Sequence, residues 1–205
     1  MRLKDEFSHS LIIEKSEFIC YLKKTFTEEE ARDYIEQIKK LHRDATHCCT
    51  AFVCGERSEI QRTNDDGEPS GTAGMPMLDA LKKNELHNCT ACVVRYFGGI
   101  KLGAGGLIRA YSKSVSEAIR LAPKVKTILI RRYSITFSYD LVGKIDFFLK
   151  DNSDILNKDF DLDVTYVVQS EDFKLPEKLI NITSGQIECI QIEECYIEKE
   201  LTNTQ

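Results

Sequence analysis

The stretch from residue 63 to residue 112 contains eight of the 11 glycines in this chain of 205 residues. Two of the four prolines also lie there, and polar residues separate its short apolar runs. Glycine costs backbone entropy on folding, so it is kept where φ is positive or where another backbone or a ligand comes close. A segment that only filled a core would hold fewer glycines. We therefore interpret this stretch as a surface site built from two loops.

The first loop covers residues 64–74 and carries a group of polar side chains. They are Asp65, Asp66, Glu68, Ser70 and Thr72. Neighbouring carboxylates can hold a hard cation or perform acid–base chemistry. Asp-Gly and Pro-Ser-Gly are also ordinary turn sequences, and Ser70 or Thr72 can cap a following helix. For catalysis the turn interpretation is favoured, because the sequence has no known hydrolase or metalloprotease motif.

The second loop, residues 98–106, leads from a strand-like run into a helical pattern. Its glycines are Gly98, Gly99, Gly103, Gly105 and Gly106, and the surrounding cations are Arg95, Lys101, Arg109 and Lys113. Amides at a glycine turn and at a helix N-terminus attract anions. The spacing matches neither a phosphate-binding P-loop nor a dinucleotide fingerprint. We interpret the loop as an anion site, with a tightly packed strand-to-helix turn as the structural alternative.

The charge is unevenly distributed along the chain, whose formal net charge is −5. Residues 1–130 hold 20 basic and 18 acidic side chains, whereas residues 131–205 hold 8 and 15. Residues 95–126 contain seven bases and one acid, Glu117. We expect this basic strip to attract phosphate, with a merely solvated helix face as the alternative. Tyr96 and Phe97 would stack on nucleic-acid bases if exposed, although aromatics at a strand end more often pack under a helix.

The composition, 42% hydrophobic and 30% charged, is that of a globular protein, and no apolar run is long enough to span a membrane. The N-terminus lacks the apolar core of a signal peptide, so we expect a cytoplasmic protein with eight reduced cysteines. Cys89 and Cys92 form a C-x-x-C motif, but side chains three apart on a strand point to opposite faces. His47 and His87 are isolated. We expect neither a metal site nor a cofactor.

Apolar periodicity predicts an α+β chain of two domains, residues 1–126 and 127–205. For the first domain it predicts a hairpin over 9–25, helices over 28–42 and 77–83 and from 107 to before Pro123, and strands at 46–54, 59–63 and 89–97. For the second it predicts strands at 127–139, 154–160, 163–169 and 186–196, with helices at 141–150 and 173–182. The second order, β-α-β-β-α-β, is typical of ferredoxin-like folds.

Two segments carry a resemblance to a known family. DDGEPSGTAGMPMLDAL, starting at Asp65, and RYFGGIKLGAGGLIRAYSKSV, starting at Arg95, resemble the IMPACT family and its YigZ group in bacteria. Shorter matches at residues 15–19 and 45–48 extend the resemblance over nearly all of residues 1–125. Two positions depart from the family pattern: Cys48 stands where asparagine is common, and Glu17 where a base is common.

The resemblance implies a first domain that is an α+β sandwich, similar to one in ribosomal proteins and elongation factor G. It implies a second domain similar to the C-terminal domain of that factor. Relatives are linked to control of translation and, in eukaryotes, to restraint of a starvation-activated kinase through a shared activator protein. No enzymatic activity is tied to the family.

These observations lead to one main hypothesis and two alternatives. We expect a non-enzymatic cytoplasmic regulator of translation that binds RNA, the ribosome or a translation-associated protein, with Arg95, Lys101, Arg109 and Lys113 contacting phosphate. The first alternative is an enzyme acting on a small phosphorylated ligand, with Mg²⁺ held by the acids of the first loop. It requires the two loops to face one pocket. The second alternative is a regulator that binds protein through its acidic second domain.

Overall fold

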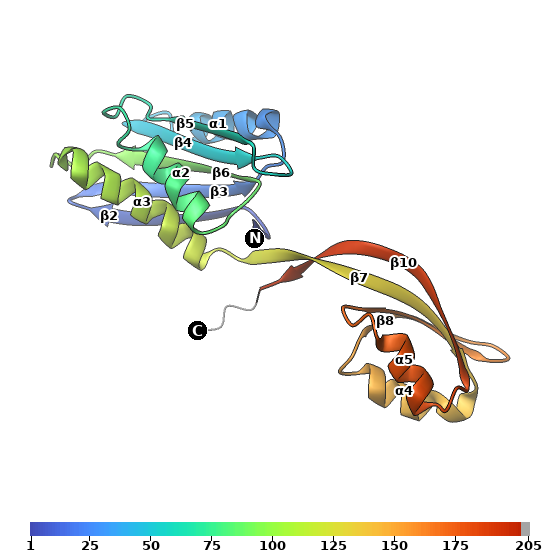
Figure 1. The fold of residues 1–205 in the computed structure, drawn as a ribbon. Coiled ribbons are helices and arrows are strands. Elements are labelled where there is room, and N and C mark those ends of the chain that lie inside the picture. Colours follow the sequence, from blue (N-terminus) through green and yellow to red (C-terminus); the bar gives the residue numbers. More distant parts are fainter. Residues whose placement is uncertain (202–205) are drawn as a thin grey trace. The chain divides into compact units, whose positions relative to one another are not determined.

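The computed structural model describes residues 1–201, which form two compact units (Figure 1). Unit 1 holds Met1–Lys126 together with the described residues from Glu200 on, and unit 2 holds Thr127–Lys199. Helices pack on an antiparallel sheet in each unit, so the predicted α+β class is confirmed. Among the described residues, no helix combines the length and the apolar character that crossing a membrane requires.

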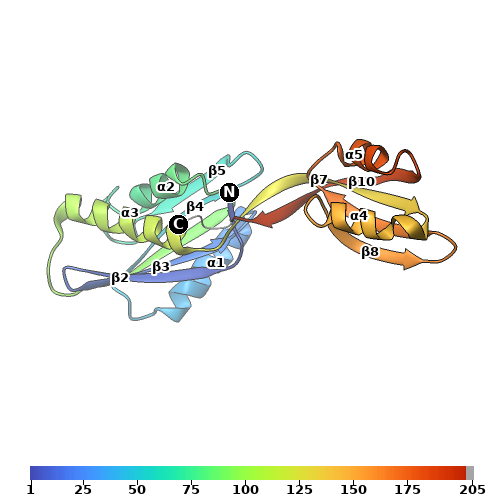
Figure 2. The same ribbon diagram turned by 90° about the horizontal axis from the view of Figure 1, so that it is seen from below.

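Unit 1 is built on an antiparallel sheet with the strand order β2-β3-β6-β4-β5. Its strands are β2 (Phe7–Ile13), β3 (Ser16–Lys24), β4 (His47–Cys54), β5 (Ile60–Asn64) and β6 (Cys89–Tyr96). Helices α2 (Gly74–Lys83) and α3 (Gly103–Leu121) cover one face, and α1 (Glu28–Leu41) covers the other (Figures 1 and 2). The sheet is therefore buried on both sides.

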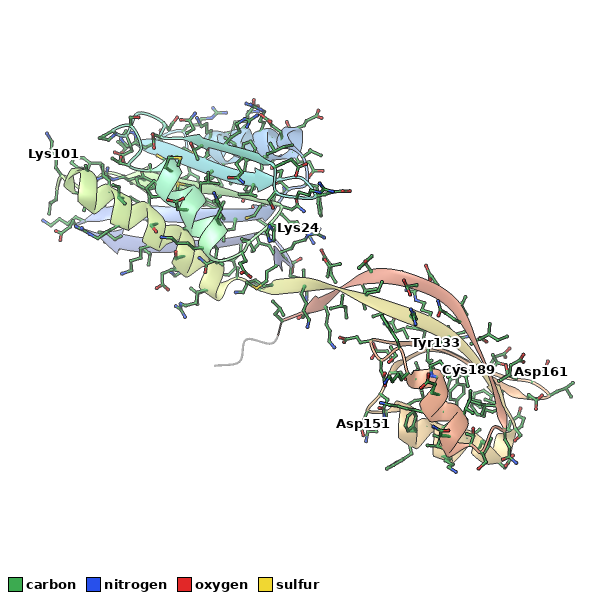
Figure 3. All side chains as sticks on the ribbon, viewed as in Figure 1. Lys24, Lys101, Tyr133, Asp151, Asp161 and Cys189 are labelled. Atoms are coloured by element: carbon green, nitrogen blue, oxygen red, sulfur yellow. The ribbon has the colours of Figure 1, made fainter. Side chains whose placement is uncertain are left out.

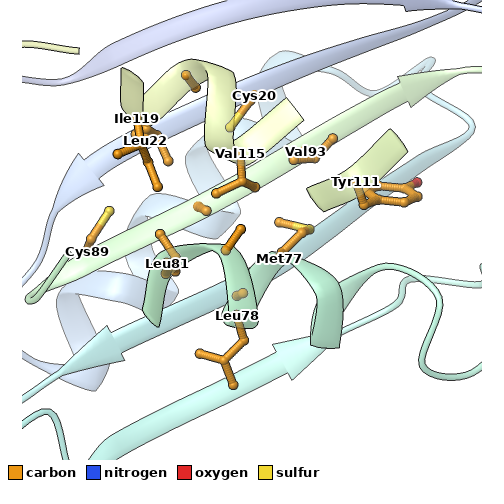
Figure 4. Close-up of a cluster of buried hydrophobic side chains, with 14 of the residues drawn as sticks. Cys20, Leu22, Met77, Leu78, Leu81, Cys89, Val93, Tyr111, Val115 and Ile119 are labelled. Atoms are coloured by element: carbon orange, nitrogen blue, oxygen red, sulfur yellow. The ribbon is translucent and has the colours of Figure 1, made fainter. Parts of the chain in front are cut away.

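A separate cluster of buried side chains lies on each face of this sheet. Met77, Val93 and Val115 belong to the cluster beneath α2 and α3 (Figure 4). Cys89 lies in this same cluster, whereas Cys92 lies in the cluster beneath α1. The two sulfur atoms thus occupy opposite faces, as the strand geometry predicts, and they do not form a C-x-x-C redox pair.

Helix α3 begins at Gly103, inside the segment expected to be loop. Leu102 packs on the buried cluster beneath α3, and Leu107 is buried in that cluster. These contacts account for a helix that begins one turn earlier than expected from the sequence. Gly105 and Gly106 therefore lie in the first helical turn. The low helix propensity of glycine concealed this start in the sequence, because tertiary packing overrides propensity.

Unit 2 has the predicted order of elements. They are β7 (Lys124–Phe137, which begins in unit 1), α4 (Val142–Leu149, preceded by a 3₁₀ turn at Tyr139–Leu141), β8 (Asp154–Phe160), β9 (Val164–Ser170), α5 (Leu175–Ile182) and β10 (Ile187–Glu200). Strand β7 pairs with both β9 and β10, and β8 pairs with β9. This is the β-α-β-β-α-β arrangement of a ferredoxin-like fold. A short strand not expected from the sequence, β1 (Arg2–Leu3), pairs with the start of β7.

Candidate functional site

Asp65, in the first loop, holds the start of α2. Its carboxylate accepts hydrogen bonds from the backbone N–H groups of Gly71 at 2.8 Å, Ala73 at 3.0 Å and Gly74 at 2.8 Å. Burial by itself raises the pKa of Asp65, but the three amides outweigh burial and hold that pKa below its ordinary value. Asp65 therefore performs the capping that the sequence assigned to Ser70 or Thr72. Ser70 is exposed, and the Thr72 hydroxyl donates to the Pro69 carbonyl at 2.6 Å.

Asp66 is occupied in the same way, at the other side of the loop. Its carboxylate accepts from the backbone N–H of Cys48 at 2.7 Å and from Lys39 Nζ at 2.9 Å. Burial raises its pKa, yet these two donors lower it below the ordinary value. Asp66 thus ties the loop to β4 and α1. Its backbone carbonyl lies 2.8 Å from His47 Nδ1, so this histidine is positioned by the loop.

Glu68 points away from both aspartates, into a buried polar cluster. Its Oε1 accepts from Arg95 Nη1 at 2.6 Å and from the Tyr111 hydroxyl at 2.8 Å. Within residues 1–201, no three His, Cys, Asp or Glu side chains form a group that could hold a metal ion. The structure therefore does not bring Asp65, Asp66 and Glu68 together as one set of Mg²⁺ ligands. Each carboxylate has its own protein partners.

Arg95 is buried, so its expected place in an exposed basic patch is also wrong. Its side chain is 6% exposed, and its guanidinium lies 5.3 Å and 5.4 Å from the ring centres of Phe18 and Phe97. The strand alternation contained this information. Cys89, Ala91 and Val93 face the cluster beneath α3, and position 95 continues the same period of two.

A pocket of about 360 Å³ opens beside this buried cluster, and we call it the Glu68 pocket. It is lined by Thr46, His47, Glu68, Pro69, Arg95, Phe97, Lys101, Leu102, Gly103, Ala104 and Leu107. Glu68 and Pro69 come from the first loop, whereas residues 101–104 come from the second loop and the start of α3. The two loops therefore do face one pocket. The spacing of residues in the sequence did not identify Thr46, His47 or Leu107 as pocket residues. They line the pocket because the pairing of strands in the sheet and the packing of α3 bring them there.

A second depression of about 500 Å³, the basic groove, lies along the start of α3. It is lined by Ile13, Glu14, Ile100, Lys101, Leu102, Gly106, Arg109, Ala110 and Lys113. Lys101, Arg109 and Lys113 are exposed, and none of them forms an ion pair with any residue that the structure describes. Figure 3 shows Lys101 beside the start of α3. The structure thus brings together three of the four predicted cations and leaves Arg95 apart from them.

Two other bases of the strip, Arg120 and Lys124, have partners within the chain. Arg120 pairs with Glu117 at 2.7 Å, and Lys124 Nζ donates to the carbonyls of Ile119 at 2.6 Å and Ala122 at 3.1 Å. Lys124 therefore caps the C-terminal end of α3.

The structure explains three of the glycines in the second loop in two ways, by close packing and by backbone conformation. A Cβ at Gly98 would lie 1.9 Å from the carbonyl oxygen of Lys15, so this glycine allows the loop to touch the β2–β3 turn. Gly99 and Gly103 have φ of +87° and +67°, a conformation that other residues rarely adopt. The N-terminus of α3 has no side-chain cap. Its amides are consequently open beside Lys101.

All residues that line the two depressions, except Ile13, lie inside a recognised domain. Residues 14–119 match the Impact N-terminal domain. The chain is 45% identical to IMPACT family member YvyE of Bacillus subtilis (strain 168), over 98% of this chain and 94% of that relative. It is 36% identical to IMPACT family member YigZ of Escherichia coli (strain K12), over 89% and 92%. A crystal structure of a hypothetical protein, 35% identical, covers 93% of this chain and 96% of its own with a TM-score of 0.58. The chain belongs to the IMPACT family.

Proposed function

We propose that this protein binds the phosphate backbone of RNA through Lys101, Arg109 and Lys113, and that this binding regulates translation. The observation that carries the proposal is the basic groove, which these three exposed cations line together. Translation is the process to which the family resemblance points. Such a protein needs no catalytic group.

The electrostatics of the basic groove favour a polyanion. Glu14 is the one acid among the residues that line it. Arg109 and Lys113 lie one helical turn apart on α3, so about 6 Å separates their Cβ atoms. The uncapped N-terminus of α3 adds partial positive charge at Lys101. The net charge of −5 would repel RNA elsewhere, and the groove therefore also determines the orientation of binding.

The test is a titration of labelled single-stranded RNA of mixed sequence at several salt concentrations, followed by fluorescence anisotropy. Each neutralised phosphate releases counterions, so the binding constant decreases with salt. The magnitude of the negative slope of log K against log salt decreases by about 0.7 for each phosphate-binding cation removed. We expect the triple variant Lys101→Gln, Arg109→Gln, Lys113→Gln to lose about 2 from this slope.

The matched control is the triple variant Lys40→Gln, Lys83→Gln, Lys144→Gln. It removes the same charge from exposed lysines that do not line the groove. We expect it to keep the slope of the unmodified protein. Absent binding, salt-independent binding, or an equal loss in the control would each overturn the proposal. An in vitro translation assay with the same two variants then tests the link to translation.

A further inference from the structure

We propose that the Glu68 pocket receives the base of a nucleotide, guanine in preference to uracil, whose phosphate lies against Lys101 and the first turn of α3. The inference rests on the phosphate binding proposed above and adds the recognition of a base. The nucleotide is either free or part of an RNA strand, because the recognised chemistry is the same.

The size and lining of the pocket suit a small ring with one polar edge. A volume of about 360 Å³ is enough for a single small ligand. Pro69, Leu102, Ala104 and Leu107 supply apolar contact. Glu68 supplies a polar group at the buried end, where the residue is 8% exposed. Apolar contacts together with one buried carboxylate fit a heterocycle better than they fit a sugar or a bare anion.

The Glu68 carboxylate has one oxygen saturated and one free. Oε1 already accepts two hydrogen bonds, from Arg95 and Tyr111, which use both of its lone pairs. Among the described residues, none donates a hydrogen bond to Oε2, and the Nε2 atom of His47 lies 3.9 Å from it, too far for a hydrogen bond. Oε2 therefore has room for a donor from a ligand. Arg95 neutralises the charge of Glu68, so a neutral N–H donor suffices and a cation is not required.

This requirement separates the bases. Guanine presents two adjacent N–H donor groups on its Watson–Crick edge, whereas uracil presents a single N–H between two carbonyl oxygens. The free oxygen Oε2, which has two lone pairs, attracts the donors of the first edge and repels the carbonyls of the second. Adenine and cytosine, with an amino group beside an acceptor nitrogen, fall between them. Bases that leave the stack are commonly read through this edge.

Two further features of the lining support a ligand of this type. Phe97, at the side of the pocket, is 45% exposed, and an exposed ring is a platform on which a base can stack. Arg95 Nε is buried without a hydrogen-bond partner in the described structure. Buried polar groups usually have a partner, so this cluster has unused hydrogen-bonding capacity.

The pocket and the basic groove are joined through Lys101 and Leu102, which line both. Gly103 and Ala104 line the Glu68 pocket and belong to the uncapped first turn of α3. A phosphate attached to a base in the pocket therefore meets Lys101 and the helix N-terminus. The next phosphates of a strand would continue toward Arg109 and Lys113.

A single introduced fluorophore can report occupancy, because the chain contains no tryptophan. Phe97→Trp places one in the wall of the pocket. Phe26→Trp is the matched control, since Phe26 is also 45% exposed and does not line the pocket. Both variants are titrated with GMP, AMP, CMP and UMP, and with five-nucleotide RNAs that differ only in the central base.

We expect saturable quenching in Phe97→Trp and none in Phe26→Trp, with guanine preferred over uracil by about tenfold. Quenching by free GMP assigns the pocket to a soluble nucleotide, and quenching by guanine-containing RNA alone assigns it to a strand. No saturable quenching by either overturns the inference. So does equal affinity for all four bases.

A pocket-filling variant separates this inference from the proposed function. Ala104→Phe fills the pocket from an exposed position, and Ala104→Ser is its conservative control. We expect Ala104→Phe to abolish the base preference and to keep the salt dependence of RNA binding. Salt-dependent RNA binding that ignores both the base and Ala104→Phe overturns the pocket alone. Absence of RNA binding together with specific GMP binding overturns the proposed function alone.

Discussion

Arg95 Nη1 lies 2.6 Å from Glu68 Oε1, and the two side chains are 6% and 4% exposed. The pair connects β6 to the first loop, which α2 separates in the sequence, and Tyr111 of α3 joins it. Because both side chains are buried, each charge is stabilised by the other. Water does not reach either charge to solvate it when its partner is removed. Removal of one therefore leaves an uncompensated buried charge.

The first prediction is that Glu68→Gln and Arg95→Met each lower the free energy of unfolding by about 3–5 kcal/mol. The double variant should lose clearly less than the sum, because neither charge is then left alone. Urea unfolding of the four proteins measures this. Glu117→Gln, which breaks the exposed pair with Arg120, serves as a control and should change the free energy of unfolding far less than either buried substitution. Additive losses at positions 68 and 95 would contradict the coupling.

The second prediction concerns the cap of α2. Asp65→Asn keeps the shape of the side chain but removes the charge that three amides bind. We expect a loss of about 1–3 kcal/mol in the free energy of unfolding. Asp79→Asn, on an exposed position of the same helix, should change it by less than about 0.5 kcal/mol. Equal effects of the two substitutions would show that Asp65 is not the cap.

The third prediction compares two glycines. Gly98→Ala brings a Cβ to 1.9 Å from the Lys15 carbonyl oxygen, so the loop must move away from the β2–β3 turn. We expect a destabilisation of at least about 1–3 kcal/mol, measured as a lowered melting temperature. Gly143→Ala, in α4, meets no atom within 4 Å and should stabilise by about 0.5–1 kcal/mol. A neutral Gly98→Ala would exclude this close approach.

The fourth prediction is a pH dependence that comes from His42. Its ring nitrogens lie 2.7 Å from the Tyr21 hydroxyl and 2.8 Å from the Tyr96 hydroxyl. Burial lowers the pKa of His42, against a weaker opposing effect of Glu17. Below a pH of about 6.5 the unfolded chain therefore binds more protons than the folded protein, and the free energy of unfolding falls as the pH falls.

Above that pH both states hold a neutral ring, so the contribution of His42 is constant. Urea unfolding between pH 8 and pH 5.5 should show this decrease, and His42→Gln should reduce its steepness. His87, whose pKa burial also lowers, should leave part of the dependence in the variant. An unchanged steepness in His42→Gln would exclude His42 as a source.

Much of the fold was accessible from local patterns. Apolar periodicity predicted a helix over 28–42, and α1 begins at Glu28, where the Thr27 hydroxyl accepts from the Glu30 N–H at 3.2 Å. The period of two placed Cys89 and Cys92 on opposite faces, and the order of elements in unit 2 predicted its ferredoxin-like sheet. Each of these helices and strands depends on residues that are close together in the sequence, so the pattern along the chain contains them.

The candidate site depended on contacts between distant segments. The sequence by itself determined that loops 64–74 and 98–106 are special and that cations gather near the second. Only the tertiary structure decided that Arg95 turns inward to Glu68, that Asp65 holds α2, and that Lys101 stands between two depressions. These interacting residues come from different strands, helices and loops. They come into contact because the strands pair in one sheet and the helices pack on it. The spacing of residues along the chain does not show which distant segments meet. The sequence therefore shows that residue 95 is a base, but it does not show that Arg95 is buried against Glu68.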